Sequence, residues 1–238
     1  MKNSSLLLLM ILFSCASLFA QKTVHDANAQ PRKVHGYHAI EIGGGVDLYL
    51  SQGNEEAVAV SATTEAYRDM IRVEVVDGVL KIGLEPGSGW KMNWGNRKMK
   101  AYVSAKELDG IKAGGGSDVY VDNEIHSNNL QLRFSGGSDF KGKVKTDQLS
   151  LHVSGGSDAY ISGQTEKAHI IASGGSDIHA YDLNTNFSTI ESSGGSDIHI
   201  TANKEIHVTA SGGSDVYYKG NASLVSNKGG GSGVKRVN

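Results

Sequence analysis

Cysteine, proline and aromatic residues are scarce in this sequence, and neither sign of charge predominates. The 238 residues include one Cys, two Pro and 7% aromatic residues, and 23 basic side chains stand against 25 acidic ones. So few cysteines exclude a disulfide-stapled domain, and the balanced charge argues against a nucleic-acid-binding protein. Hydrophobic residues make up 39% of the chain, which is enough for the packed core of a single domain.

The one long apolar run lies at the N-terminus. Residues 6–13 are apolar, and small residues lead to a cleavage site between Ala20 and Gln21, the pattern of a secretory signal peptide. Lipidation at Cys15, which ends a loose lipobox, is the alternative. No other run is long enough for a membrane-spanning helix. We therefore expect an exported protein with a signal peptide at 1–20, a linker at 21–33, a single domain at 34–233 and a tail at 234–238.

Glycine is abundant, with 31 residues, and much of it belongs to an internal repeat. The tetrapeptide Gly-Gly-Ser-Asp occurs six times at intervals of 18 to 21 residues. Its aspartates are Asp118, Asp139, Asp158, Asp177, Asp197 and Asp215. Degenerate copies occur at 43–47 and 230–233, as expected of the atypical end repeats of a solenoid.

The residues between these copies alternate with a period of two. Counted from each aspartate, the odd positions are mostly apolar, for example Leu130, Leu132 and Phe134 before Asp139. Such alternation, with glycine turns at regular intervals, predicts an all-β fold: a parallel β-helix or solenoid with coils of about 19 residues, stacked about 4.8 Å apart.

The N-terminal half departs from this regularity, because 71 residues separate Asp47 from Asp118. We expect antiparallel hairpin elements there. The expected elements are a strand at 57–62, a helical turn at 64–71, a hairpin at 72–84 around Asp77-Gly78, and a loop at 86–98 that contains Trp90 and Trp94.

Three stretches together carry a resemblance to a known family. They are the segment 38–50, the Gly-Gly-Ser-Asp repeats and the segment 214–221. Over about residues 34–233 the chain resembles the bacterial family named putative auto-transporter adhesin, head GIN domain. The resemblance implies a right-handed β-helix-like fold, no established activity, and export in a Gram-negative bacterium to the periplasm, the outer-membrane surface or the medium.

Stacked coils would align side chains into columns on the outer face. The six aspartates form one column, and Tyr120, Lys141, Tyr160, His179, His199 and Tyr217 form another two residues later. The aspartates with Tyr120, Tyr160 and Tyr217 are our candidate ligand-binding residues, because sugar rings pack on aromatic faces while their hydroxyls bind carboxylates. The structural alternative is that each aspartate caps its own turn.

Cation binding is a second candidate chemistry for these columns. The aspartates could hold calcium weakly, and Asp177, His179, Asp197 and His199 on adjacent coils could form a site for zinc. We otherwise expect no cofactor.

These features favour a binding protein of the cell envelope over an enzyme. The expected function is adhesin-like contact with glycans or surface proteins, and an oligomer is compatible with open strand edges. The alternatives are a structural envelope scaffold without a ligand, and a polysaccharide lyase or hydrolase. Catalysis is disfavoured because six equivalent aspartates give no pair of unlike carboxylates.

Overall fold

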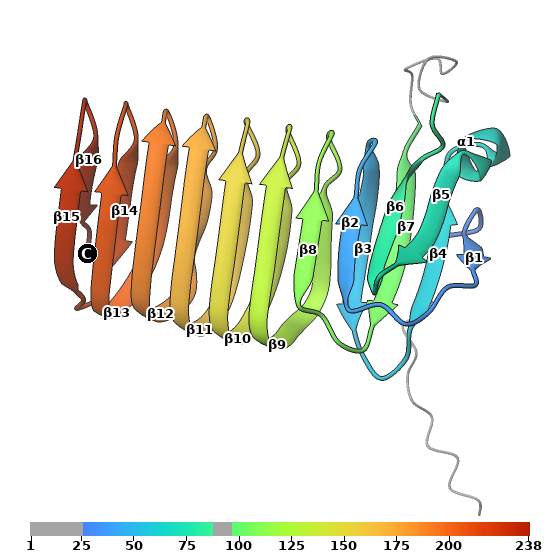
Figure 1. Ribbon diagram of the computed structural model, residues 1–238, viewed down its shortest axis with the longest axis horizontal. Helices are drawn as coiled ribbons and strands as arrows, with labels where there is room; N and C mark the ends of the chain where they lie inside the picture. Colours follow the sequence, from blue (N-terminus) through green and yellow to red (C-terminus); the bar gives the residue numbers. More distant parts are fainter. Residues whose placement is uncertain (1–25, 88–96) are drawn as a thin grey trace, which may run out of the picture.

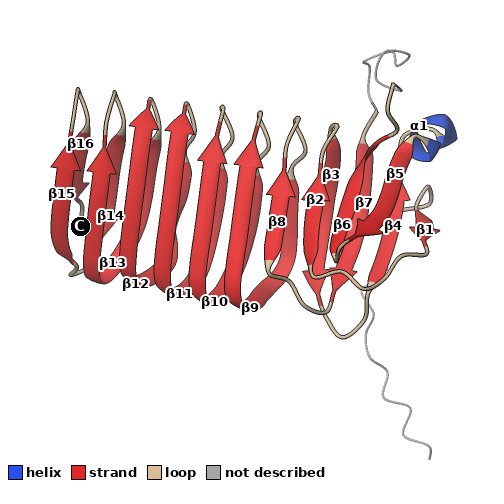
Figure 2. Cartoon of the chain, in the orientation of Figure 1, coloured by secondary structure: helices blue, strands red, loops and turns tan. Residues whose placement is uncertain are grey.

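The computed structural model describes residues 26–87 and 97–238, and nearly all of the regular structure is β. The expected signal peptide with Ala20, Gln21 and Cys15 lies outside the described residues, as do Trp90 and Trp94. Figure 1 shows an elongated stack of coils, and Figure 2 shows a short helix at one end. The predicted parallel β-solenoid is confirmed.

Five long bent strands form the regular part of the solenoid. They are β9 (Val119–Ser135), β10 (Phe140–Ser154), β11 (Ala159–Gly174), β12 (Ile178–Gly194) and β13 (Asp197–Ala210). Neighbouring strands are parallel, and equivalent residues pair: Leu149 lies beside Leu130 and Ala168. Each strand therefore forms one coil of the repeat.

Each coil has two faces and two corners. The segment after the aspartate forms what we call the aspartate face, and the segment before the next glycine pair forms the return face. The glycine corner joins them at the upper edge of Figure 1, and a bend within each long strand, the wide corner, joins them at the lower edge.

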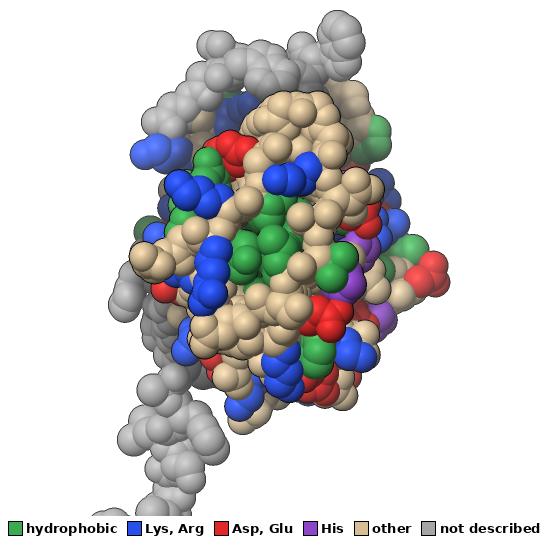
Figure 3. Space-filling view, turned by 90° about the vertical axis from the view of Figure 1, so that its left-hand side faces the viewer, with side chains coloured by type: hydrophobic (Ala, Val, Ile, Leu, Met, Phe, Trp, Pro, Cys, Tyr) green, Lys and Arg blue, Asp and Glu red, His purple; other side chains and the backbone are tan. Residues whose placement is uncertain are grey.

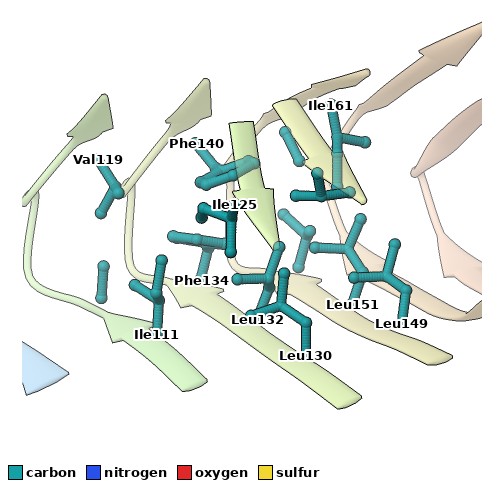
Figure 4. Packing of buried hydrophobic residues seen from close by; sticks show 14 of the residues in the cluster. Ile111, Val119, Ile125, Leu130, Leu132, Phe134, Phe140, Leu149, Leu151 and Ile161 are labelled. Carbon is teal, nitrogen blue, oxygen red and sulfur yellow. The ribbon is translucent and has the colours of Figure 1, made fainter. Parts of the chain in front are cut away.

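The apolar residues of the alternating pattern lie inside the coils. Leu132, Phe134 and Phe140 are at most 1% exposed, and the rings of Phe134 and Phe140 lie 5.0 Å apart in neighbouring coils (Figure 4). The odd positions counted from each aspartate face inward both before and after the glycine corner, as predicted. The corner therefore does not reverse the alternation. The serine of each Gly-Gly-Ser-Asp copy is also fully buried.

The glycine corners have two forms. The corner at Gly155-Gly156 has positive φ at both glycines, as do the two corners before it, whereas at Gly174-Gly175 and the two corners after it only the first glycine does. The serine bonding changes at the same place. The N–H of Ser138 donates to Ser157 Oγ at 3.0 Å, but Ser176 Oγ donates to the carbonyl of Ser173 at 2.8 Å.

The coils of the N-terminal half do not follow one another in chain order. The first coil, β2 (Ala39–Ile42) and β3 (Val46–Gln52), lies between two later ones. On one side β2 pairs with β6 (Val79–Leu84) and β3 pairs with β7 (Met99–Ala105). On the other side β2 pairs with β8 (Gly110–Ala113) and β3 with β9. After β3 the chain therefore builds β6 and β7 on one side of the first coil and then crosses to the other side, where β8 and β9 continue the stack.

The segment between β3 and β8 contains the predicted hairpin and helical turn. Strands β5 (Ile71–Val76) and β6 are antiparallel, joined by Asp77 and Gly78, both at positive φ. The helix α1 (Glu65–Asp69) begins after Thr64, whose side chain accepts from the N–H of Tyr67. Strand β4 (Ala57–Ser61) pairs antiparallel with β7 and with β1 (Gln30–Arg32). These elements cover the N-terminal end of the solenoid.

The C-terminal end of the solenoid consists of a last full coil, β14 (Asp215–Lys219) and β15 (Ser223–Lys228), and of β16 (Gly233–Arg236), which stacks on β14. Its inward positions turn polar, because Ser226 and Lys228 pair with Val208 and Ala210, and Arg236 pairs with Tyr218. Figure 3 looks onto this end and shows a small apolar centre surrounded by backbone and polar side chains. This composition suits a terminal coil whose outer side meets water.

Strand pairing extends beyond the expected domain of 34–233. Strand β1 lies within 21–33, the expected linker, and β16 reaches into 234–238, the expected tail. Pro31 is tolerated in β1 because β1 pairs only with β4 and thus lies at the edge of the sheet.

Candidate functional site

The six aspartates form a ladder of hydrogen bonds between coils. The backbone N–H of each aspartate donates to Oδ1 of the aspartate in the preceding coil, over 2.9 to 3.2 Å. The ladder starts at Asp47, which accepts from the N–H of Asp118. The side chains thus cap the next coil, whereas the structural alternative placed the bond within each aspartate's own turn. One oxygen of each ladder carboxylate from Asp47 to Asp197 has this role.

At two places the second carboxylate oxygen binds a tyrosine of the same strand. Tyr120 donates its hydroxyl to Asp118 Oδ2 at 3.3 Å, and Tyr217 donates to Asp215 Oδ2 at 3.2 Å. Burial, followed by the charge of Asp118, raises the pKa of Tyr120 to about 12. The bond to Asp215 is the main cause that raises the pKa of Tyr217. Both phenols therefore remain neutral donors at physiological pH.

The first carboxylate of the ladder, that of Asp47, has a pKa above the ordinary value of an aspartate. Burial raises the pKa of Asp47, and the charge of Asp118 acts in the same direction. The hydrogen bond from the Asp118 N–H and the charge of Lys100 oppose that shift.

Beside the aspartates runs a column of stacked aromatic rings, which we call the aromatic column. Its first part contains Tyr102, Tyr49 and Tyr120, with successive ring centres 5.3 Å apart. Lys141 occupies the next position, paired with Tyr120 on one side and Tyr160 on the other. The second part contains Tyr160, His179, His199 and Tyr217, with successive centres 4.5, 5.6 and 5.1 Å apart. The predicted alignment of these side chains is therefore present, and the sequence missed that Tyr49 and Tyr102 extend it.

Tyr181 braces the second part of the aromatic column. Its hydroxyl lies 3.0 Å from His199 Nδ1, its ring meets the His199 ring edge-on at 5.1 Å, and Lys219 Nζ lies 4.6 Å from its ring centre. Burial lowers the pKa of His199, and the nearby His179 lowers it further, against the opposing charges of Asp197 and Asp177. The neutral imidazole is thereby favoured within the stack.

The suggested zinc ligands Asp177, His179, Asp197 and His199 do lie on adjacent coils. The two imidazoles stack with their planes 4° apart, so their faces meet, and Asp177 Oδ1 is already bonded to the N–H of Asp197. Within residues 26–87 and 97–238, no group of three or more His, Cys, Asp or Glu is placed to hold a metal ion.

The wide corner holds a second column that the sequence analysis did not identify. Thr146 and Thr165 are nearly buried, and each donates its hydroxyl to the carbonyl two residues later, at 2.9 Å, as well as to one in the preceding coil. Thr185 continues this column and donates to Thr201 at 2.9 Å. The signal was present in the sequence, because threonine recurs seven or eight residues after three successive aspartates.

No helix in the described part of the chain is long and apolar enough to cross a membrane. No protein with curated annotation matches the chain.

Solved structures with the same fold come from Bacteroides and Parabacteroides species. A putative adhesin from Bacteroides fragilis matches with a TM-score of 0.79 at 23% identity, covering 88% of this chain and 96% of that one. A putative adhesin from Parabacteroides distasonis matches with a TM-score of 0.71 at 19% identity, over 88% and 96%. A putative lipid binding protein from the same species matches with a TM-score of 0.69 at 18% identity, over 90% and 98%. At these identities the likeness shows a shared fold.

The sequence itself identifies the family. Residues 36–222 match the family described as "Putative auto-transporter adhesin, head GIN domain", and the match spans the solenoid from before β2 to β14. The chain therefore belongs to this putative auto-transporter adhesin, head GIN domain family.

Proposed function

We propose that this protein is an exported, adhesin-like component of the cell envelope that contacts glycans or surface proteins through its aspartate face. The observation that carries the proposal is the aromatic column, because it places tyrosine and histidine rings beside carboxylates along an outer face. The family description and the adhesin names of two structural neighbours support a binding role.

The break at Lys141 is where a ligand would find aromatic faces. Elsewhere in the column each ring covers the next, which leaves mainly ring edges toward solvent. Tyr120 and Tyr160 flank the break and are 37% and 47% exposed, so each has a ring face without a stacked aromatic neighbour. A sugar ring packs its apolar side on such a face, and its hydroxyls can bond to nearby carboxylates. Tyr217 offers the corresponding surface at the far end of the column, next to Lys235.

An array of bacterial and host glycans and surface proteins, probed with and without calcium, tests this proposal. The comparison is between the wild-type protein and a Tyr160→Ala/Tyr217→Ala variant. Val225→Ala is the matched control, since Val225 is 54% exposed in β15 on the return face. Binding that is lost in the double variant and kept in the control is the expected result. No binding by the wild-type protein, or equal binding by the double variant, would overturn the proposal.

A structural scaffold is the second candidate function, and the aspartate ladder favours it. Every repeat aspartate takes part in a coil-to-coil hydrogen bond, so the repeat is accounted for without a ligand. In that case Asp177→Asn and Asp197→Asn would lower thermal stability and change no binding reaction.

We assign no catalytic role to the aspartates and propose no cofactor. Glycoside cleavage uses two carboxylates with different environments. The repeat aspartates are all half-buried, and those from Asp118 to Asp197 each accept a hydrogen bond from the backbone N–H of the next aspartate. A lyase or hydrolase would instead show turnover of an acidic polysaccharide that a single aspartate variant abolishes.

A further inference from the structure

A shallow groove of about 640 Å³ runs along the wide corner, beside the buried threonines. One wall follows the aspartate-face side of the corner and includes Lys145, Gln164 and Asn184, which pair from strand to strand. The other wall follows the outermost point of the bend and includes Asp147, Glu166 and Asn186. The groove is therefore parallel to the solenoid axis, on a different edge from the glycine corners.

The length of the groove suits a linear polymer. Its lining residues come from all five long strands, β9 to β13. Five strands at a spacing of about 4.8 Å extend over about 19 Å. A chain-like ligand along this axis would meet similar side chains at every coil.

The lining is polar throughout, because none of the described residues that form it is apolar. Carboxamides such as Gln164, Asn184 and Asn186 both donate and accept hydrogen bonds, as a hydroxyl group does. The positive charge of Lys145 is offset by Asp147 and Glu166, so the groove does not favour a polyanion. Grooves that bind peptides usually offer apolar pockets for side chains, which this one lacks.

One wall is held in place by bonds between coils. Glu166 accepts from Asn186 Nδ2 at 2.5 Å and from Lys204 Nζ at 3.4 Å. The bond from Asn186 is the main cause that lowers the pKa of Glu166. Lys204 also lies 5.1 Å from the ring centre of Phe187, which follows Asn186 in β12 and is 38% exposed.

We propose that this groove binds a linear, neutral polysaccharide chain aligned with the solenoid axis. The site goes beyond the function proposed for the aromatic column and is independent of it. Two glycan-binding strips on one molecule would allow it to bridge separate chains.

Calorimetric titration with linear neutral hexasaccharides of glucose, mannose and N-acetylglucosamine tests the site, with the matching disaccharides and a hexagalacturonate for comparison. We expect at least one neutral hexasaccharide to bind more tightly than its disaccharide and than the acidic oligomer. Gln164→Ala/Asn184→Ala should weaken this binding at least about tenfold, because two direct hydrogen bonds are removed. Tyr160→Ala/Tyr217→Ala should bind as the wild-type protein does.

The variants separate this site from the aromatic column. Neither the Gln164 nor the Asn184 side chain forms a hydrogen bond with the described part of the protein, so their removal should leave the melting temperature unchanged. Binding that survives in the groove variant and disappears in the tyrosine variant would overturn the groove and support the column. Absence of binding by every neutral hexasaccharide, or tighter binding of hexagalacturonate, would also overturn the proposal.

Discussion

The aspartate of each repeat stabilises the stack through its neighbour rather than through its own turn. Oδ1 of Asp158 accepts from the N–H of Asp177, while the N–H of Asp158 donates to Asp139. The carbonyl of Asp158 accepts from the N–H of Phe140 at 2.9 Å. Each aspartate thus joins adjacent coils through both its backbone and its carboxylate.

Replacing this carboxylate tests its role at a single rung. Asp158→Ala leaves the half-buried N–H of Asp177 without its acceptor, so we expect a loss of about 1–3 kcal/mol in the free energy of unfolding. Asp158→Asn should cost less, because an amide oxygen can still accept. Urea denaturation measures both, with the exposed Asp182→Ala as control. No loss in Asp158→Ala would contradict the ladder.

His199 should make stability depend on pH. Its pKa in the folded protein lies below the ordinary value of 6.5, so the unfolded chain binds more protons below that pH. Stability from this group is therefore present above pH 6.5 and decreases as the pH falls from 6.5 toward the folded pKa. We expect His199→Gln to reduce this decrease, measured as the urea midpoint across the acidic range. His152→Gln, on the return face, is the control, and equal slopes for His199→Gln and the wild-type protein would show that His199 contributes nothing.

At the scale of elements, the regular coils and the hairpin at 72–84 were predictable, but the order in which the N-terminal coils stack was not. Period-two alternation and repeat spacing predict the inward residues, because strand geometry fixes both. Strand geometry does not predict the order of the coils around β2 and β3. Strands β6 and β7 lack the Gly-Gly-Ser-Asp repeat, and their pairing with β2 and β3 depends on how the whole segment between β3 and β8 folds. The spacing also cannot tell whether a carboxylate bonds within its turn or to the next coil.

The two forms of glycine corner show the same limit. Gly156 and Gly175 hold the same place in the repeat, so the sequence predicts the same strain when either is replaced. The structure corrects this prediction, because Gly156 has φ of +77° whereas φ of Gly175 is outside the positive region. The difference coincides with the change in serine bonding between successive corners.

These glycines form a matched pair for mutation. A Cβ at either position would meet nothing within 4 Å, so only backbone conformation distinguishes them. Gly156→Ala should destabilise by about 1–2 kcal/mol. Gly175→Ala should be neutral or slightly stabilising, because alanine reduces the freedom of the unfolded chain. Thermal and urea denaturation measure both, and equal destabilisation would mean that the corners share one conformation.

On the scale of the whole molecule, three surfaces with different chemistry run along the solenoid: two edges and one face. The glycine corners and the aspartate ladder hold the coils together, the aromatic column lies on one face, and the polar groove follows the wide corner. The N-terminal end is covered by β4, β1 and α1, and the C-terminal coil has polar inward positions. The sides of the stack are therefore the surfaces through which we propose that the protein binds.

The most direct test of this account is the binding of fluorescently labelled protein to intact bacterial and host cells, measured by flow cytometry. Three proteins would be compared: the wild-type protein, the Tyr160→Ala/Tyr217→Ala variant and the Val225→Ala control. Equal melting temperatures would first show that all three are folded. The account predicts saturable binding by the wild-type and control proteins and a marked loss in the tyrosine variant. Equal binding by all three proteins, or no binding by any of them, would contradict it.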